Sequence, residues 1–354
     1  MIPKVGDVTA KRILSIYKDS KSFIEDKGKY LKSIANNNNK LIDNLCLHIN
    51  DDLRRKAEKE YNFITKNNIK AYFYTDKEYP YRLKNYEDSP NLIYFKGNTD
   101  LNPLRSVSII GTRKPSGYGN TIVKKIVEGL KEYNVTIYSG LAYGIDYLAH
   151  REAILNNCPT IGILAHGLNK IYPAAHKSIY KEIQSNGGLL TEFNSQFGMT
   201  KINFPRRNRV IAGISDATII IESPEKGGAM ITAEIANSYN KDVFAVPGSI
   251  LNDKSTGCNK LIHKNKAALI TSAEDIAYLM NWERKEESQK KIKFTDFNEE
   301  EQKVISIIKT HESLTFDQLK KESGLQVGKL SCMLLDFEFK GIVVTLPGNA
   351  YRLC

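Results

Sequence analysis

Apolar residues change their spacing along the chain, and these changes divide it into four predicted parts. In residues 1–68 they recur at helical intervals, as at 8–17 and 53–64. A shorter helix is expected at 41–45, and the asparagine run 36–39 predicts a loop. We therefore expect an all-α N-terminal domain at 1–68.

The start of this domain, residues 3–10, resembles the hairpin of a helix-hairpin-helix unit, in which backbone N–H groups at a helix N-terminus hold a DNA phosphate. Such a hairpin normally offers two glycines, but here Asp7 stands between Gly6 and the expected helix. The segment therefore favours structural packing or partner docking over direct DNA contact. The domain is classed as SAM-like or helix-hairpin-helix-like.

From 69 to 282, short apolar runs alternate with amphipathic stretches, which is typical of a parallel sheet flanked by helices. Strands are expected at 107–110, 136–138, 160–164, 188–190, 217–221, 243–245 and 268–270, and helices at 120–133, 147–156 and 232–239. The runs 71–74 and 92–95 add strands or a lead-in segment. Because near-continuous apolar strands are buried on both faces, we predict an α/β, doubly wound, Rossmann-like domain.

The remaining residues predict a linker and a third domain. Residues 283–296 are expected to be the linker, since the charged stretch 283–291 lacks apolar periodicity. Helices follow at 299–310, 315–323 and 327–340, and a Pro-Gly-Asn turn then joins strands 342–346 and 350–353. This order predicts a winged-helix domain at 297–354.

Composition supports a folded protein of the cytoplasm. Hydrophobic residues make up 41% of the 354 residues and charged residues 26%, which excludes wholesale disorder. The first residues carry charges where a signal peptide would be apolar, and no run approaches the length of a membrane span. The five scattered cysteines lack zinc spacing and are expected to be reduced, mainly buried thiols.

Positive charge matters here through its clustering. The 51 Lys and Arg against 40 Asp and Glu give a net charge of +11, which by itself only raises the odds of a polyanionic partner. The stretch 201–209 contains four cations around Phe204, and no acid occurs from 193 to 215. Cations for phosphates and a ring for base stacking are the elements of a single-stranded nucleic acid site. Asn208 and Arg209 have an alternative role, which is to point inward and tie the helix to neighbouring loops.

Three Gly-rich turns follow predicted strands, at 111–119, 139–146 and 224–232. Ligands of open parallel sheets bind beyond the carboxyl ends of the strands, where such turns lead into helix N-termini. The first turn offers backbone N–H groups, hydroxyls and two cations. Each turn alone equally fits the tight connection that the fold needs, but together the three would line one edge.

The sequence gives no sign of a familiar cofactor site or catalytic centre. Strict G-x-G-x-x-G and Walker patterns are missing, which disfavours ordinary NAD binding and that class of NTPase. The six histidines lack metal-ligand spacing. Asp146 and His150 have the spacing of an acid/base couple on a helix, but such a pair more often packs a helix turn. We predict no catalytic residue, no metal and no cofactor.

Four stretches of the central domain, in this order and spacing, carry a recognisable pattern. They are Gly111-Thr112-Arg113-Lys114-Pro115-Ser116, Ser139-Gly140-Leu141-Ala142-Tyr143-Gly144-Ile145-Asp146, 204–215 beginning Phe204-Pro205-Arg206-Arg207-Asn208-Arg209, and Val246-Pro247-Gly248-Ser249 with 257–262. They closely resemble the DNA-processing protein A (DprA, or Smf) family, in which similar helical and winged-helix accessory domains occur. One departure is 225–230, where that family usually has a Ser-Gly-Ser-Leu type of turn.

The resemblance implies a cytosolic bacterial recombination mediator without catalytic activity. Such proteins bind single-stranded DNA that enters during natural transformation, protect it and load the RecA recombinase onto it, commonly as homodimers. The family's positively charged pocket maps onto Gly111, Thr112, Arg113, Lys201, Phe204, Arg206, Arg207 and Arg209. With Ser139, Gly140 and Asn208 added, these residues form the predicted DNA-binding set.

Two alternatives stay open. The central domain also resembles Rossmann-like enzymes that cleave the N-glycosidic bond of nucleoside monophosphates with a Pro-Gly-Gly-x-Gly-Thr-x-x-Glu loop, which Gly227-Gly228, Thr232 and Glu234 partly repeat. In the winged helix, Lys329 and Lys340 would suit duplex DNA, but the neighbouring residues favour a protein contact. Those neighbours are Asp336, Phe337, Glu338 and Phe339.

Overall fold

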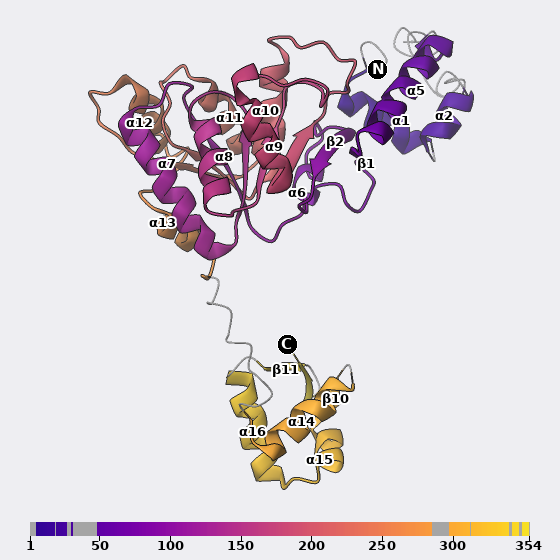
Figure 1. The fold of residues 1–354 in the computed structure, drawn as a ribbon, viewed down its shortest axis with the longest axis vertical. Coiled ribbons are helices and arrows are strands. Elements are labelled where there is room, and N and C mark those ends of the chain that lie inside the picture. Colours follow the sequence, from indigo (N-terminus) through magenta and orange to yellow (C-terminus); the bar gives the residue numbers. More distant parts are fainter. Residues whose placement is uncertain are drawn as a thin grey trace. The chain divides into compact units, whose positions relative to one another are not determined.

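The computed structural model describes residues 5–17, 19–26, 30, 48–284, 297–311, 313–339, 342–346 and 349–353. The chain divides into two compact units, 1–284 and 285–354, each of which is described by itself (Figure 1). The expected loop at 36–39, the helix at 41–45 and the linker residues 285–296 lie outside the described residues. The finer division into four parts stays a prediction.

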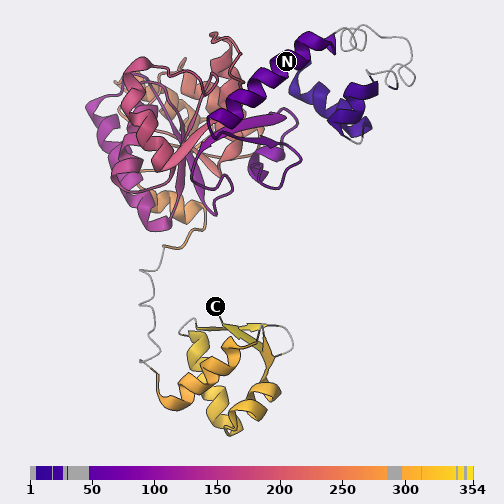
Figure 2. The same cartoon turned by 45° about the vertical axis from the view of Figure 1, so that its right-hand side comes forward.

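The N-terminal helices belong to the first unit. They are α1 (Asp7–Ile16), α2 (Ser20–Asp26) and α5 (Asp51–Lys66), and α5 leads directly into the first strand (Figure 2). The Asp7 carboxylate accepts the backbone N–H of Asn91 at 3.0 Å, and Lys11 donates to the carbonyl oxygen of Tyr86 at 3.1 Å. These contacts hold the start of α1 against the segment before β2, which supports packing over DNA contact for residues 5–10.

The described residues of the first unit form a nine-stranded sheet in the order β1-β2-β6-β5-β4-β3-β7-β8-β9. The strands are β1 (Lys70–Phe73), β2 (Leu92–Gly97), β3 (Ser106–Ile110), β4 (Thr136–Gly140), β5 (Thr160–Ile163), β6 (Gly187–Thr191), β7 (Ala217–Ile220), β8 (Asp242–Ala245) and β9 (Ala268–Leu269). Strands β3 to β9 are parallel, whereas β2 pairs antiparallel with both β1 and β6. The expected parallel strands are confirmed, and the runs at 71–74 and 92–95 form the antiparallel edge.

Helices cover both faces of this sheet. One face carries α7 (Gly117–Leu130), α8 (Ile145–Leu155), α9 (Lys177–Ser185) and α13 (Ala273–Leu279), and the other carries α6 (Tyr81–Lys84), α10 (Asn203–Ile214), α11 (Gly228–Ser238) and α12 (Thr256–His263). Single 3₁₀ turns occur at Lys131–Tyr133, Ala174–His176 and Asp253–Ser255. The doubly wound, Rossmann-like prediction is confirmed.

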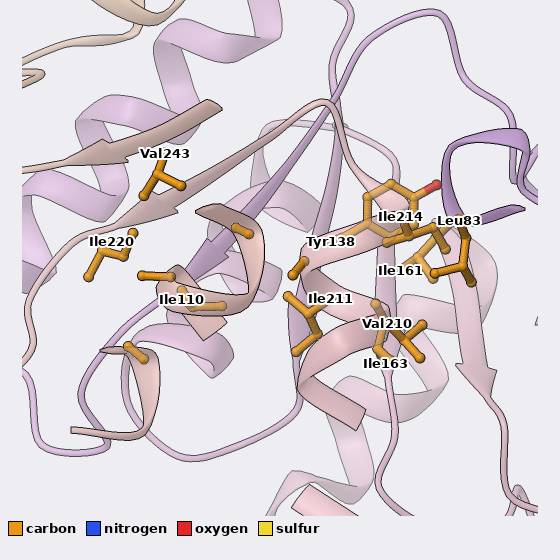
Figure 3. Close-up of a cluster of buried hydrophobic side chains, with 14 of the residues drawn as sticks. Leu83, Ile110, Tyr138, Ile161, Ile163, Val210, Ile211, Ile214, Ile220 and Val243 are labelled. Atoms are coloured by element: carbon orange, nitrogen blue, oxygen red, sulfur yellow. The ribbon is translucent and has the colours of Figure 1, made fainter. Parts of the chain in front are cut away.

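Helix α10 is fixed in its rotation by one apolar side. That side packs against three central strands of the sheet through Val210, Ile211, Ile214, Ile110, Tyr138 and Ile161 (Figure 3). Pro205 and Arg206 lie on the exposed side of the first turn. Because a helix that follows a strand in such a sheet begins at the edge where the strands end, packing places the first turn of α10 at that edge.

The second unit is a winged helix. Its helices are α14 (Glu299–Lys309), α15 (Phe316–Ser323) and α16 (Val327–Phe339), and its small sheet has the order β10 (Leu314–Thr315), β12 (Ala350–Leu353), β11 (Val343–Leu346). Val304, Leu319 and Phe337 lie in its buried core. The predicted three helices and hairpin are confirmed, and β10 is a strand that the sequence did not indicate.

Two remaining expectations concern membranes and cysteines. Among the described residues, the structure contains no helix with the length and apolar character needed to cross a membrane. Cys158 and Cys258 are buried free thiols and Cys332 is an exposed one, while Cys46 and Cys354 lie outside the described residues.

Candidate nucleic-acid interface

The turn after β3 is held by a buried carboxylate. Glu222, which follows β7, is 1% exposed and accepts the backbone N–H of Ser116 at 2.8 Å and its hydroxyl at 2.5 Å. The Glu222 carbonyl accepts the N–H of Thr112 at 2.7 Å. The expectation that this turn offers its N–H groups to a ligand is therefore wrong for Thr112 and Ser116, because both serve the protein's own contacts. The Arg113 and Lys114 side chains remain exposed.

The turn after β4 is locked onto the turn after β3. The backbone N–H of Ile145 donates to the Thr112 carbonyl at 3.1 Å. Gly144 has a φ of 81°, and a Cβ there would lie 2.3 Å from the Thr112 carbonyl oxygen, so glycine is required at this position. Tyr143, just before it, is 49% exposed. The two turns thus form one rigid support that presents Arg113 and Tyr143.

A pocket opens where β3, β4 and β5 end. Its lining includes Arg113, Tyr143, His166, Tyr172, Phe204 and Arg207. The Arg113 guanidinium lies over the Phe204 ring, 5.9 Å from its centroid, and the Tyr172 ring meets Phe204 edge to face at 6.0 Å. Lys201 is exposed three residues before Phe204. We refer to Arg113, Tyr143, Tyr172, Lys201 and Phe204 as the binding face.

Two charged groups are buried below this face. Arg207 is 6% exposed and donates to the Ile163 carbonyl, while its Nε has no hydrogen-bond partner among the described residues. Burial raises the pKa of Asp146 to about 6, and the Arg207 charge opposes that rise. A Cβ on Gly140 would lie 2.5 Å from Asp146 Oδ2 and 2.6 Å from an Arg207 nitrogen. Gly140 therefore leaves the space that both charged side chains occupy.

The acid-free stretch of the sequence has acidic neighbours in space. The Glu192 side chain is 4% exposed and forms ion pairs with Arg206, at 3.3 Å, and with Arg209. Asp7 of α1 also contacts Arg209, at 3.1 Å. Arg209 therefore ties α10 to two neighbouring segments, which is the alternative role that the sequence left open. Arg206 remains 44% exposed and lies over the Phe193 ring.

The structure gathers part of the predicted set and sets the rest apart. Arg113, Phe204 and Arg207 line the pocket, Gly111 and Thr112 directly precede Arg113 in the turn after β3, and Lys201 and Arg206 lie exposed at the start of α10. Ser139 is fully buried, and its hydroxyl donates to the Ile109 carbonyl at 2.6 Å. Asn208 is half-buried. In this arrangement the Ser139 side chain supports the sheet and does not reach solvent.

Three contributors to this site were missed by the sequence reasoning. Tyr143 stands within a Gly-rich turn, so an aromatic residue among small ones at a strand end was an available signal. Tyr172 lies 32 residues from Phe204 in the sequence and has no local pattern that connects the two. Glu222 follows an ordinary buried strand, and only the fold brings it to Ser116.

Asp146 and His150 do not form an acid/base couple. The His150 ring hydrogen-bonds with the Thr160 hydroxyl at 2.7 Å, and burial lowers the pKa of His150 to about 3, so the ring is neutral. Asp146 lies instead beside Arg207. The pair therefore has the packing role that such spacing more often has. No group of three metal-ligating side chains occurs in the described part of the chain.

Comparison with known protein families agrees with this architecture. Residues 70–281 match the family model for DNA recombination-mediator protein A, and residues 295–349 match that of the DprA winged helix domain. A DNA processing protein DprA from Streptococcus pneumoniae is 40% identical over 201 residues, which cover 57% of this chain and 71% of that protein.

Solved structures show the same relationship. The X-ray structure of DNA processing protein A from Streptococcus pneumoniae has a TM-score of 0.61 and 29% identity, and the match covers 80% of this chain and 100% of that one. DNA processing protein A from Helicobacter pylori has a TM-score of 0.55 and 29% identity, covering 61% of this chain and 97% of that one. The latter structure is described as revealing a single-stranded DNA binding mode of that protein.

Proposed function

This chain belongs to the DNA recombination-mediator protein A (DprA/Smf) family, and from that membership we propose that it binds and protects single-stranded DNA and loads RecA onto it during natural transformation. The single-stranded DNA binding described for the Helicobacter pylori relative supports the first step. RecA and a second copy of this chain are the proposed partners, on the strength of the family resemblance. The proposed place of action is the cytoplasm.

The observation that carries this proposal is the stacking of Arg113 on Phe204 at the mouth of the pocket, 5.9 Å from guanidinium to ring centroid. Phosphate binding needs cations that are not already neutralised. Arg113, Lys114 and Lys201 are exposed, and none of the three has an ion pair within the described ranges. The phosphates of a DNA strand would therefore meet cations without ion-pair partners at this edge of the sheet.

The aromatic residues of the binding face favour single strands over duplex. Phe204, Tyr172 and Tyr143 offer ring surfaces next to the free cations. Unpaired bases can stack on such rings, whereas bases inside a duplex are already stacked on their neighbours. Within the predicted set, we propose that Gly111, Thr112, Arg113, Lys201 and Phe204 contact DNA. Arg206 joins them through its exposed side, because the Glu192 carboxylate that it pairs with is shared with Arg209. The other members of the set hold the contacting residues in place and do not touch DNA; they are Ser139, Gly140, Arg207, Asn208 and Arg209.

We propose that the protein acts without catalysing a reaction. In the alternative enzyme, Glu234 would act on a nucleotide ribose. Its carboxylate instead pairs with Lys266 at 2.6 Å, and Thr232 is 2% exposed. These contacts give the N-glycosidic alternative no support.

For the winged helix we propose a protein contact. Leu335 and Glu338 lie exposed on α16, and Lys329 is paired with Glu300, which reduces its value for a phosphate. Phe337 is buried in the core and so is not part of that surface. Lys340 and the Phe339 side chain lie outside the described residues. Deletion of 284–354 should leave duplex binding nearly unchanged, and a large loss would contradict the protein contact.

The direct test measures binding of a fluorescent oligothymidine by anisotropy. The variant Arg113→Ala/Lys201→Ala should weaken binding on the order of tenfold or more, because two phosphate contacts are lost. Lys124→Ala/Lys125→Ala on α7 removes the same charge from exposed positions and is the matched control. Equal effects of the two double variants would reject the site. A RecA assembly assay on oligonucleotide coated with single-strand-binding protein then tests loading.

A further inference from the structure

Glu60 is the buried residue of α5, a helix that is otherwise mostly exposed. Its side chain is 4% exposed, and both carboxylate oxygens accept the backbone N–H of Ser195, at 2.9 and 3.0 Å. The Ser195 hydroxyl adds a third hydrogen bond at 2.5 Å. A buried carboxylate is costly unless such bonds replace its water. The contact therefore links α5 firmly to the segment that follows β6.

The same segment leads to the binding face. A second bond from α5 lies next to the first, where the Gln196 side-chain amide donates to the Lys56 carbonyl at 2.7 Å. Farther on, Asn203 at the start of α10 donates to the Gly198 carbonyl at 3.0 Å. Lys201 lies between these anchors and Phe204 lies directly after them. The path of residues 195–203 is thus set by α5 at one end and by α10 at the other.

The N-terminal helices supply a carboxylate beyond Phe204 as well. Asp7 at the start of α1 pairs with Arg209 at 3.1 Å. Glu60 and Asp7 therefore contact the chain on either side of Lys201 and Phe204, at Ser195 and at Arg209. Both carboxylates come from a part of the chain that the sequence assigns to a separate helical domain.

We propose that Glu60 is a positioning residue for single-stranded DNA, which orders residues 195–203 so that Lys201 and Phe204 are in place before DNA arrives. The inference rests on the proposed function and extends it. A loop that is already ordered binds more tightly, because its entropy of ordering is not lost at the moment of binding. The N-terminal helices are then part of the DNA site, although their role is support and not contact.

If the Glu60 carboxylate is removed, simple charge attraction and the positioning role predict opposite changes in DNA affinity. Removing a negative charge near a polyanion site should strengthen DNA binding by simple attraction. Loss of the Ser195 anchor should instead weaken it, on the order of tenfold, because hydrogen bonds to a buried charge are strong. The salt dependence of binding should stay the same, because no cation that contacts phosphate is lost.

The experiment compares Glu60→Ala with Glu58→Ala, an exposed carboxylate two residues earlier on α5, in the full chain. Oligothymidine affinity is measured across salt concentrations, and amide hydrogen exchange of 195–203 is measured without DNA. We expect Glu60→Ala to weaken binding with an unchanged salt slope and to speed the exchange of this segment. Glu58→Ala should do neither.

A second variant keeps the test valid if Glu60→Ala fails to fold. Ser195→Ala removes only the hydroxyl bond and should produce smaller changes in the same directions. If the wild-type chain binds oligothymidine and the Glu60 and Glu58 variants behave alike, the positioning role is rejected while the proposed function stands. If the wild-type chain does not bind, the proposed function itself is rejected.

Discussion

The Glu222 carboxylate accepts hydrogen bonds from both the backbone N–H and the hydroxyl of Ser116. These bonds connect the chain just after the end of β7, where Glu222 lies, to the turn after β3, where Ser116 lies. From these neighbouring strands the sheet grows in opposite directions, toward β6 on one side and β9 on the other. Open α/β sheets usually bind ligands in the crevice at such a point. Here a protein carboxylate fills that place, and the exposed cations and rings lie instead over the ends of β3 to β5.

The first prediction concerns this internal carboxylate. Glu222→Ala should destabilise the first unit by about 2 kcal/mol, because Ser116 loses its buried, charged acceptor. The freed N–H and hydroxyl of Ser116 should then donate hydrogen bonds to a bound anion, so phosphate should raise the Tm of the variant more than that of the wild type. Thermal unfolding in phosphate and in chloride at equal ionic strength measures both effects, and an equal response of the two proteins would contradict this account.

Phe204 should contribute stacking. Phe204→Ala is expected to cost roughly 1–3 kcal/mol of single-stranded DNA binding, without a change in salt slope, because a ring and not a charge is removed. Tyr278→Ala, which removes an 85% exposed ring from α13, is the matched control. Titration of a fluorescent oligonucleotide with both variants provides the comparison. Similar losses of affinity in Phe204→Ala and Tyr278→Ala would contradict a stacking role for Phe204.

Substitution of Arg113 should affect DNA binding, whereas substitution of Arg207 should affect protein stability. Arg113→Ala should reduce the slope of log affinity against log salt by about 0.7, the value for one contact on a single strand. Arg207→Ala should mainly lower stability, by about 3 kcal/mol, because it leaves Asp146 buried without its neighbouring positive charge. Urea unfolding together with the salt series separates the two, and a stable Arg207 variant with a reduced slope would show direct phosphate contact.

The buried Asp146 should make stability depend on pH. Its folded pKa of about 6 lies above the unfolded value of about 4, so the folded protein binds more protons between these values. The contribution of Asp146 is therefore complete below pH 4 and is lost as the pH rises to 6. Burial lowers the pKa of His150, His166 and His176, which makes stability rise with pH over the same range in both proteins. The test is therefore the difference in urea-unfolding free energy between wild type and Asp146→Asn, which should fall from pH 4 to 7. Parallel curves for the two proteins would contradict the assignment.

Much of the fold could be predicted because its signals are local. The strand at 217–221 is a nearly continuous apolar run, interrupted only by the β-branched Thr218, which is typical of a buried parallel strand. The helix–helix–helix–hairpin order at 299–353 is equally local. The extra strand β10 was missed because two residues, Leu314 and Thr315, carry no periodicity and pair only through the fold.

The site could be predicted only in part, for a related reason. Lys201, Phe204 and Arg206 stand close together in the sequence, so their charge and aromatic character were visible. The acids that neutralise Arg209 come from 17 and 202 residues away, and the charge pattern of 193–215 could not reveal them. The same holds for Glu222, which occupies the N–H groups of Thr112 and Ser116 in the first turn, and for Glu60.

The central claim is that this edge of the sheet holds single strands through uncompensated cations. The most direct measurement is the affinity of the full chain for oligothymidine and for duplex of equal length across a series of salt concentrations, with wild type and Arg113→Ala/Lys201→Ala. We expect tighter binding to the single strand at every salt concentration, and a slope reduced by about 1.4 in the double variant. Equal affinity for the two DNA forms, or an unchanged slope in the double variant, would contradict the claim.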